Sequence, residues 1–324
     1  MPDGGNEPPY RETAFQPDSR PLTGIALKVA SVAVFVGMSS FIKAAGQVPA
    51  GQIVFFRSFF AIFPVLVVLA FRNELRTAFR TKRPFNHALR GIVGVSAMGL
   101  GFFALTRLPL PEAIALNYAQ PLLVTVFSAL FLAEPVRIYR WTAVIIGLVG
   151  VLIISWPKLT LFGSGEAMDN QEALGVMAAL AAASISACVM LLIRNLVRTD
   201  RTSTIVLWFS MTASVAALLT IPFGWEALTT RQWILLVGSG FCGGLGQILM
   251  TEAYRHAEAS TVAPFEYTSM LLGLIVGYLV FHDVPTVHML VGSVIVIGAG
   301  IFIIWRERQL GLERTAARKV SPPQ

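Results

Sequence analysis

The apolar residues of this chain are gathered into runs of about 20, separated by short polar segments. A helix rises 1.5 Å per residue, so a run of roughly 20 crosses the ~30 Å hydrocarbon core of a bilayer. Charged residues make up only 13% of the 324-residue sequence, whereas soluble domains carry roughly a quarter. The runs therefore predict an all-α integral membrane protein.

We predict ten transmembrane helices. They are placed near residues 22–42, 52–71, 87–106, 113–132, 140–156, 173–193, 203–223, 232–252, 262–281 and 287–305. Interior prolines such as Pro64 and Pro121 do not exclude helix, because neighbouring helices and polar side chains can satisfy the freed carbonyls.

The remaining segments are tails. Residues 1–21 are polar, mixed in charge and rich in proline, which predicts a disordered cytoplasmic tail rather than a cleavable signal. Residues 306–324 are predicted to be a second disordered cytoplasmic tail, which is basic. Between them we expect a first repeat over residues 22–156 and a second repeat over residues 173–305.

Lysine and arginine residues alternate between the two sides of the predicted membrane. If the N-terminus is cytoplasmic, eighteen of them fall inside and four outside: Lys43, Arg107, Lys158 and Arg231. The positive-inside rule therefore predicts that both termini are cytoplasmic and that the protein is a multi-pass protein of the cell membrane.

The two halves of the chain resemble each other at offsets of 145 to 152 residues. The matches are Gly24 with Gly175, Lys43 with Arg194, Ser58 with Ser210, Gly99-Leu-Gly101 with Gly244-Leu-Gly246, Asn117-Tyr118 with Glu266-Tyr267, and Gly150 with Gly300. Five spans per copy is an odd number, so the second copy enters the membrane from the opposite side. Inverted repeats of this kind are typical of secondary transporters, whose substrate site lies near the midplane between the repeats.

Several motifs are similar to those of a known family. They are Phe56-Arg57, Leu108-Pro-Leu-Pro-Glu-Ala113, Asn117-Tyr-Ala-Gln-Pro121, Phe131-Leu-Ala-Glu-Pro135 and Ala263-Pro-Phe-Glu-Tyr267. With them, the chain resembles the EamA-type ten-helix proteins of the drug/metabolite transporter superfamily. The second repeat departs from the pattern at His282, where we expect a loop and no site.

The resemblance implies alternating-access transport of a small organic metabolite without ATP, through a cavity lined mainly by spans 1, 3, 4, 6, 8 and 9. The form of span 9 favours uptake of a vitamin such as riboflavin. Export of amino acids or drugs is the alternative within this class. A scaffold or lipid-handling protein that moves no solute is the alternative outside it.

Ionisable and polar residues within spans are the candidate site. Glu266 can bind a cationic substrate group or a coupling proton, or it can pair with Lys28 or Arg255. Asn117, Tyr118 and Gln120 in span 4, with Tyr267 and Thr268 as their counterparts in span 9, offer donors and acceptors to a polar solute. The other interpretation is hydrogen bonding between helices.

Four further polar or charged residues lie within the spans. Gln247 follows a glycine-rich stretch in span 8, where it can face the cavity. Lys28 and Arg57 lie close enough to span ends to extend their head groups to the interface, and Arg90 is expected to be a topology anchor.

Other classes of chemistry lack support in the sequence. Cys188 and Cys242 both lie in apolar runs, without spacing for a metal site or a disulfide framework. No Walker lysine follows a glycine-rich loop, and the four histidines fall near span ends. We therefore expect no cofactor, no metal, no nucleic acid partner and no enzymatic activity.

Overall fold

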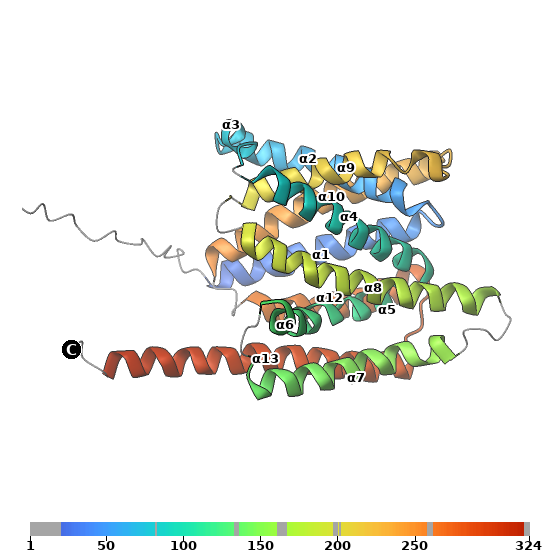
Figure 1. The fold of residues 1–324 in the computed structure, drawn as a ribbon. Helices are drawn as coiled ribbons and strands as arrows, with labels where there is room; N and C mark the ends of the chain where they lie inside the picture. The colour runs from blue at the N-terminus through green and yellow to red at the C-terminus, as the bar shows by residue number, and fades with distance from the viewer. Residues whose placement is uncertain are drawn as a thin grey trace, which may run out of the picture.

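The computed structural model describes residues 21–81, 83–132, 136–160, 167–196, 200, 202–257 and 262–320. Every regular element within these residues is a helix. The long helices lie roughly parallel or antiparallel to one another, and α7 and α13 lie side by side along one edge (Figure 1).

The first half contains α1 (Pro21–Ala44), α2 (Ala50–Phe71), the short α3 (Leu75–Ala78), α4 (Pro84–Arg107), α5 (Leu110–Asn117), α6 (Ala119–Leu132) and α7 (Ile138–Thr160). The second half contains α8 (Ala167–Leu196), α9 (Thr202–Leu218), η1 (Ile221–Phe223), α10 (Thr230–His256), η2 (Ala263–Tyr267), α12 (Thr268–Phe281) and α13 (Val287–Val320). Spans 1 to 5 are α1, α2, α4, α5 with α6, and α7. Spans 6 to 10 are α8, α9, α10, η2 with α12, and α13.

The prediction of an all-α membrane protein with ten spans is confirmed. Among the described residues, nine helical segments are long and apolar enough to cross a bilayer, and the shorter apolar helix Ser203–Leu218 supplies the tenth. That span ends before the predicted residue 223, since the 3₁₀ turn η1 follows it. The last helix continues through Val320, well beyond the predicted end at residue 305.

Span 4 is interrupted near its middle. Pro121 lacks the N–H that would bond the Asn117 carbonyl, and its ring clashes with that carbonyl in a regular helix. The chain instead makes a tighter turn at Tyr118, whose N–H bonds the Ala115 carbonyl at 3.2 Å, and a new helix starts at Ala119. Its counterpart, span 9, begins with the 3₁₀ segment η2.

The contacts between helices are nearly symmetric: exchanging the two repeats maps one contact pair onto another. α1 packs on α10 as α8 packs on α4, and α2 contacts α10 as α9 contacts α4. Three further pairs join an element to its own counterpart: α2 with α9, α5 with α12, and α7 with α13. The two five-helix repeats therefore form one inverted-topology assembly.

Individual residue contacts show the same symmetry between the repeats. A Cβ on Gly91 of α4 would lie 2.4 Å from the Thr212 side chain of α9, and a Cβ on Gly240 of α10 would lie 2.4 Å from Cβ of Phe60 in α2. This equivalence relates α4 to α10 at an offset of 149 residues. The sequence match of Gly99-Leu-Gly101 to Gly244-Leu-Gly246, at 145, therefore gave the wrong register for this helix.

The buried apolar side chains fall into two large clusters. One gathers around α1, α2 and α10 and includes Ile42, Ile53 and Leu236. The other joins α4 to α8 and to α7, α12 and α13. Ala113 and Ile114 of α5 pack against both clusters, so span 4 lies between them.

The outer surface carries large apolar side chains. On α7, Ile145, Ile146, Val149 and Leu152 are about half exposed or more. An apolar surface of this extent suits contact with lipid tails rather than water.

We predict that Gly292→Ala destabilises the protein by about 1–3 kcal/mol, because the new Cβ would lie 2.5 Å from the Gly150 carbonyl oxygen across the α7–α13 contact. The melting temperature in detergent measures this. The matched control is Gly298→Ala on the same helix, where nothing lies within 4 Å of the new atom. An equal loss in both variants would contradict close packing of α7 on α13.

Candidate substrate-binding site

A cavity of about 460 Å³ lies between the two repeats. Its walls come from α1, α4, α5, α6, α8, α10 and the start of span 9, with one residue from α2. The volume is in the range of sites that hold small organic ligands. All six spans that the family resemblance implied contribute, and span 2 is added to them through Arg57.

Five of the seven predicted site residues line this cavity: Asn117, Tyr118, Gln120, Gln247 and Glu266. The side-chain amides of Asn117, Gln120 and Gln247 make no hydrogen bond within the described part of the chain. These amides are therefore free to bond a solute. Tyr267 and Thr268 are not among the lining residues.

The two tyrosines meet at the two-fold axis, with ring centroids 5.1 Å apart. Their hydroxyls diverge. The Tyr118 hydroxyl hydrogen-bonds the Ser269 hydroxyl, which itself donates to the Glu266 carbonyl at 2.7 Å. The Tyr267 hydroxyl lies against Gly300, at a position where any Cβ would clash. Tyr118 thus lies at the cavity wall, whereas Tyr267 packs toward α13.

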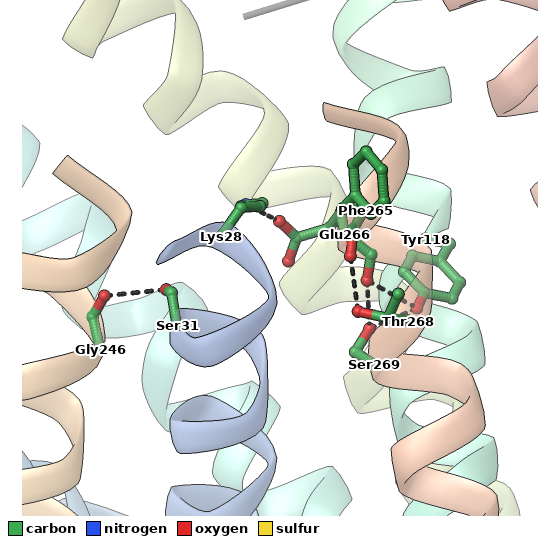
Figure 2. Close-up of polar contacts among 8 residues, drawn as sticks. All are labelled: Lys28, Ser31, Tyr118, Gly246, Phe265, Glu266, Thr268 and Ser269. Carbon is green, nitrogen blue, oxygen red and sulfur yellow. Dashed lines mark hydrogen bonds and ion pairs between the residues drawn. The ribbon is translucent and has the colours of Figure 1, made fainter. Parts of the chain in front are cut away.

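Thr268 is held by its own helix. Its hydroxyl donates to the Phe265 carbonyl at 2.6 Å, as Figure 2 shows. This bond completes the turn from η2 into α12, so the described contacts give Thr268 a local structural role.

Lys28 forms an ion pair with Glu266 (Figure 2). Its side chain is only 1% exposed, whereas that of Glu266 is 49% exposed. Lys28 also lies 5.6 Å from the ring centroid of Tyr254. The expectation that Lys28 extends to the interface is therefore wrong, because the lysine is buried against α10 and reaches span 9 instead. The side chain of Arg255, the other predicted partner, lies outside the described residues.

A second ion pair joins the opposite end of α1 to the opposite end of span 9. Lys43 Nζ lies 3.4 Å from Asp283 Oδ2 and donates to the Leu108 carbonyl at 2.7 Å. Asp283 also accepts from the backbone N–H of Leu110, at the first turn of α5. Fifteen residues separate the two lysines, about 22 Å along a helix. The cavity lies between the two pairs.

Arg57 also lines the cavity, where the sequence did not predict it. It was assigned to the interface as a structural residue, yet its side chain is 7% exposed and lines the cavity from α2. The expectation of an interfacial head group is wrong. One sequence signal was available: the repeat match of Ser58 with Ser210 pairs Arg57 with Phe209, an apolar residue.

These features define a class: polytopic membrane proteins of two inverted repeats with a cavity between them. Comparison with known proteins gives the family. The EamA-like transporter family matches over residues 22–156 and 173–306, and the chain belongs to it.

Curated relatives cover most of the chain. The pseudopaline exporter CntI of Pseudomonas aeruginosa is 32% identical over 86% of this chain and 95% of its own. The S-adenosylmethionine uptake transporter of Rickettsia bellii is 29% identical over 80% and 84%. The riboflavin transporter of Vibrio cholerae is 31% identical over 79% and 82%. A solved crystal structure, 18% identical, matches the fold with a TM-score of 0.62 over 89% of this chain and 99% of its own.

The relatives are named as transporters, and this chain is a membrane transporter. Their names differ in solute and in direction. The family therefore establishes a small-molecule transporter without identifying what it carries.

We predict that Glu266→Gln lowers the free energy of unfolding by about 1–3 kcal/mol, less than a fully buried pair would lose, because Glu266 is half exposed. Adding Lys28→Met to this variant restores most of the loss, since no buried charge is then left unpaired. Melting temperatures of the double-mutant cycle measure this.

The matched control for this cycle is Arg72→Gln, which breaks the pair of Arg72 with Glu252, in which the cation is 37% exposed rather than 1% as in Lys28. We expect it to cost at most about 1 kcal/mol. A double variant no more stable than Glu266→Gln alone would show that Lys28 is not held in place by the carboxylate.

Proposed function

We propose that the protein is a secondary active transporter that moves a small organic metabolite by alternating access through the cavity between its repeats. The observation that carries this proposal is the polar-lined cavity on the two-fold axis, bounded on both sides by an ion pair between α1 and span 9. Secondary transporters of inverted-repeat architecture place their substrate site at such an interface.

Within this proposal, the amides of Asn117, Gln120 and Gln247 bind polar groups of the solute, and the Tyr118 hydroxyl orients it. Glu266 binds a cationic group or a coupling proton. Protonation of Glu266 would weaken its pair with Lys28 and so loosen one contact between the repeats. Tyr267 and Thr268, also predicted to bind substrate, support the site by shaping the start of span 9.

The ion pairs suit a transporter that rocks one repeat against the other. α1 belongs to the first repeat and span 9 to the second, so both pairs cross the interface that must open. Opening one end of the cavity requires that the pair at that end separates while the other pair holds.

The solute and direction are finer proposals. Uptake of a vitamin such as riboflavin is one case, and export of amino acids or drugs is the other. The names of the relatives include both an exporter and uptake transporters. No catalytic step is part of the proposed function.

We predict solute flux in proteoliposomes of the full-length protein, tested in both directions with riboflavin, amino acids and nucleosides. Asn117→Leu should lower the flux of any carried solute by about tenfold, the effect of one lost hydrogen bond of ~1.4 kcal/mol. The matched control is Ser96→Ala on α4, whose hydroxyl bonds its own helix at Ile92 and lies outside the cavity. Absence of flux for every solute, with the protein folded, would favour a scaffold that moves nothing.

We also propose a cytoplasmic location for both termini, supported by the excess of lysine and arginine on one side. A green fluorescent protein fused to the C-terminus should fluoresce in bacterial cells. Alkaline phosphatase should be active when inserted at Gly46, between α1 and α2, and inactive at the C-terminus. The reverse pattern would place the termini outside.

A further inference from the structure

The guanidinium of Arg57 is buried at the cavity wall, and the described residues give it no counter-ion. Its side chain is 7% exposed, and its Nε has no hydrogen-bond partner. Within the described part of the chain it makes neither an ion pair nor a hydrogen bond. Ionised side chains within membranes normally pair with a charge or with backbone carbonyls, because leaving them unpaired is costly.

Arg90 adds a second positive charge nearby rather than compensating the first. Its guanidinium stacks on the Phe209 ring at 3.8 Å, and its Nε and Nη1 are buried without hydrogen-bond partners. It lies close enough to Arg57 for the two charges to interact. The region behind this wall of the cavity therefore carries excess positive charge.

Packing does not require an arginine at this position. Arg57 lies against Gly243 of α10, where a Cβ would be 3.3 Å from Nε. In the other repeat the equivalent slot is filled by Phe209, which lies against Gly94 of α4. An apolar ring therefore satisfies the same interface between helices, and the charge serves another purpose.

We propose that Arg57 binds the anionic group, a carboxylate, of the transported solute. The assignment rests on the proposed transport function and narrows its substrate class to organic acids, including amino acids. A guanidinium can donate two parallel hydrogen bonds to a carboxylate, which gives affinity and orientation together. The solute then supplies the counter-charge that the described protein lacks.

With the acid group at Arg57, the rest of the solute faces the amides of Asn117, Gln120 and Gln247 and the carboxylate of Glu266. An amino group on the solute would complement Glu266. Riboflavin carries no carboxylate, so this assignment argues against it and in favour of an acidic solute.

The test compares each acid with an isostere in which an uncharged group replaces the carboxylate, on the purified full-length protein in detergent. The probe pairs are nicotinate and nicotinamide, pantothenate and panthenol, and each of the twenty amino acids with its amide, together with riboflavin and sodium chloride. A ligand that binds the native state raises the melting temperature, and the stabilisation grows with the logarithm of the ligand concentration above the dissociation constant. We expect the acid of at least one pair to stabilise the wild type, and its isostere to do so at least tenfold more weakly.

The variants place the effect on Arg57. Arg57→Gln should weaken binding of that acid by about 10- to 100-fold, as expected for the loss of a charged hydrogen-bonded partner. Arg57→Lys keeps the charge without the two-pronged geometry and should retain part of the affinity. The matched control is Arg107→Gln, which removes an arginine that bonds Gln171 outside the cavity. Since the comparison of acid with isostere uses the wild type, it stands even if Arg57→Gln does not fold.

Several outcomes would overturn the assignment. They are equal effects of acid and isostere in every pair, stabilisation by riboflavin alone, or an acid effect that is unchanged in Arg57→Gln. Stabilisation by chloride alone, lost in Arg57→Gln, would assign the site to a small co-transported anion instead. Flux of neutral solutes without preference for acids would keep the transporter and remove this role of Arg57. Binding of acids without flux would support this role of Arg57 and contradict the proposed transport function.

Discussion

Inside a bilayer every backbone N–H and C=O must find a partner within the protein, because no water is present to bond it. An interruption of a spanning helix is therefore tolerated only where the protein surrounds it or where it lines a polar cavity. The residues that the structure describes include two such interruptions, at Tyr118 in span 4 and in the 3₁₀ start of span 9. The two-fold arrangement brings both to the same place, with the tyrosine rings in contact. The position of the cavity thus follows from the fold.

Much of this architecture is encoded in local sequence patterns, and it could therefore be predicted from the sequence. Apolar runs of fixed length specify spans, and their odd number per repeat specifies inversion. Which side chain faces the cavity depends on packing that the sequence does not display. Tyr118 and Tyr267 are equivalent by repeat, yet they differ because Ser269 accepts one hydroxyl while Gly300 makes room for the other. The division into tails and repeats stays a prediction.

The charged residues within the spans show more clearly that the sequence alone does not reveal which neighbours a side chain will contact. A lysine about 9 Å into a span can reach the interface or remain inside, and the choice depends on what lies beside it. Lys28 remains inside because the Glu266 carboxylate and the Tyr254 ring lie within reach. It then holds the first repeat to the second at one end of the cavity, while Lys43 and Asp283 do so at the other. The interface is held at its ends and hollow at its centre, which suits rocking of one half against the other.

The two repeats are alike where helices pack and differ where the cavity is lined. Gly91 and Gly240 make equivalent contacts, as do Gly94 and Gly243. At the cavity wall, Met98 of the first repeat is replaced by Gln247 at the equivalent position of the second, and Asn117 is replaced by Glu266. Residues that hold the scaffold must suit both copies, since both make the same contacts. Residues that contact a solute need not be alike in the two repeats, because an asymmetric solute presents different groups to each half. Differences between the repeats at the cavity are therefore the positions where we expect selectivity to be set, and the replacement of Phe209 by Arg57, which changes the charge, is one of these differences.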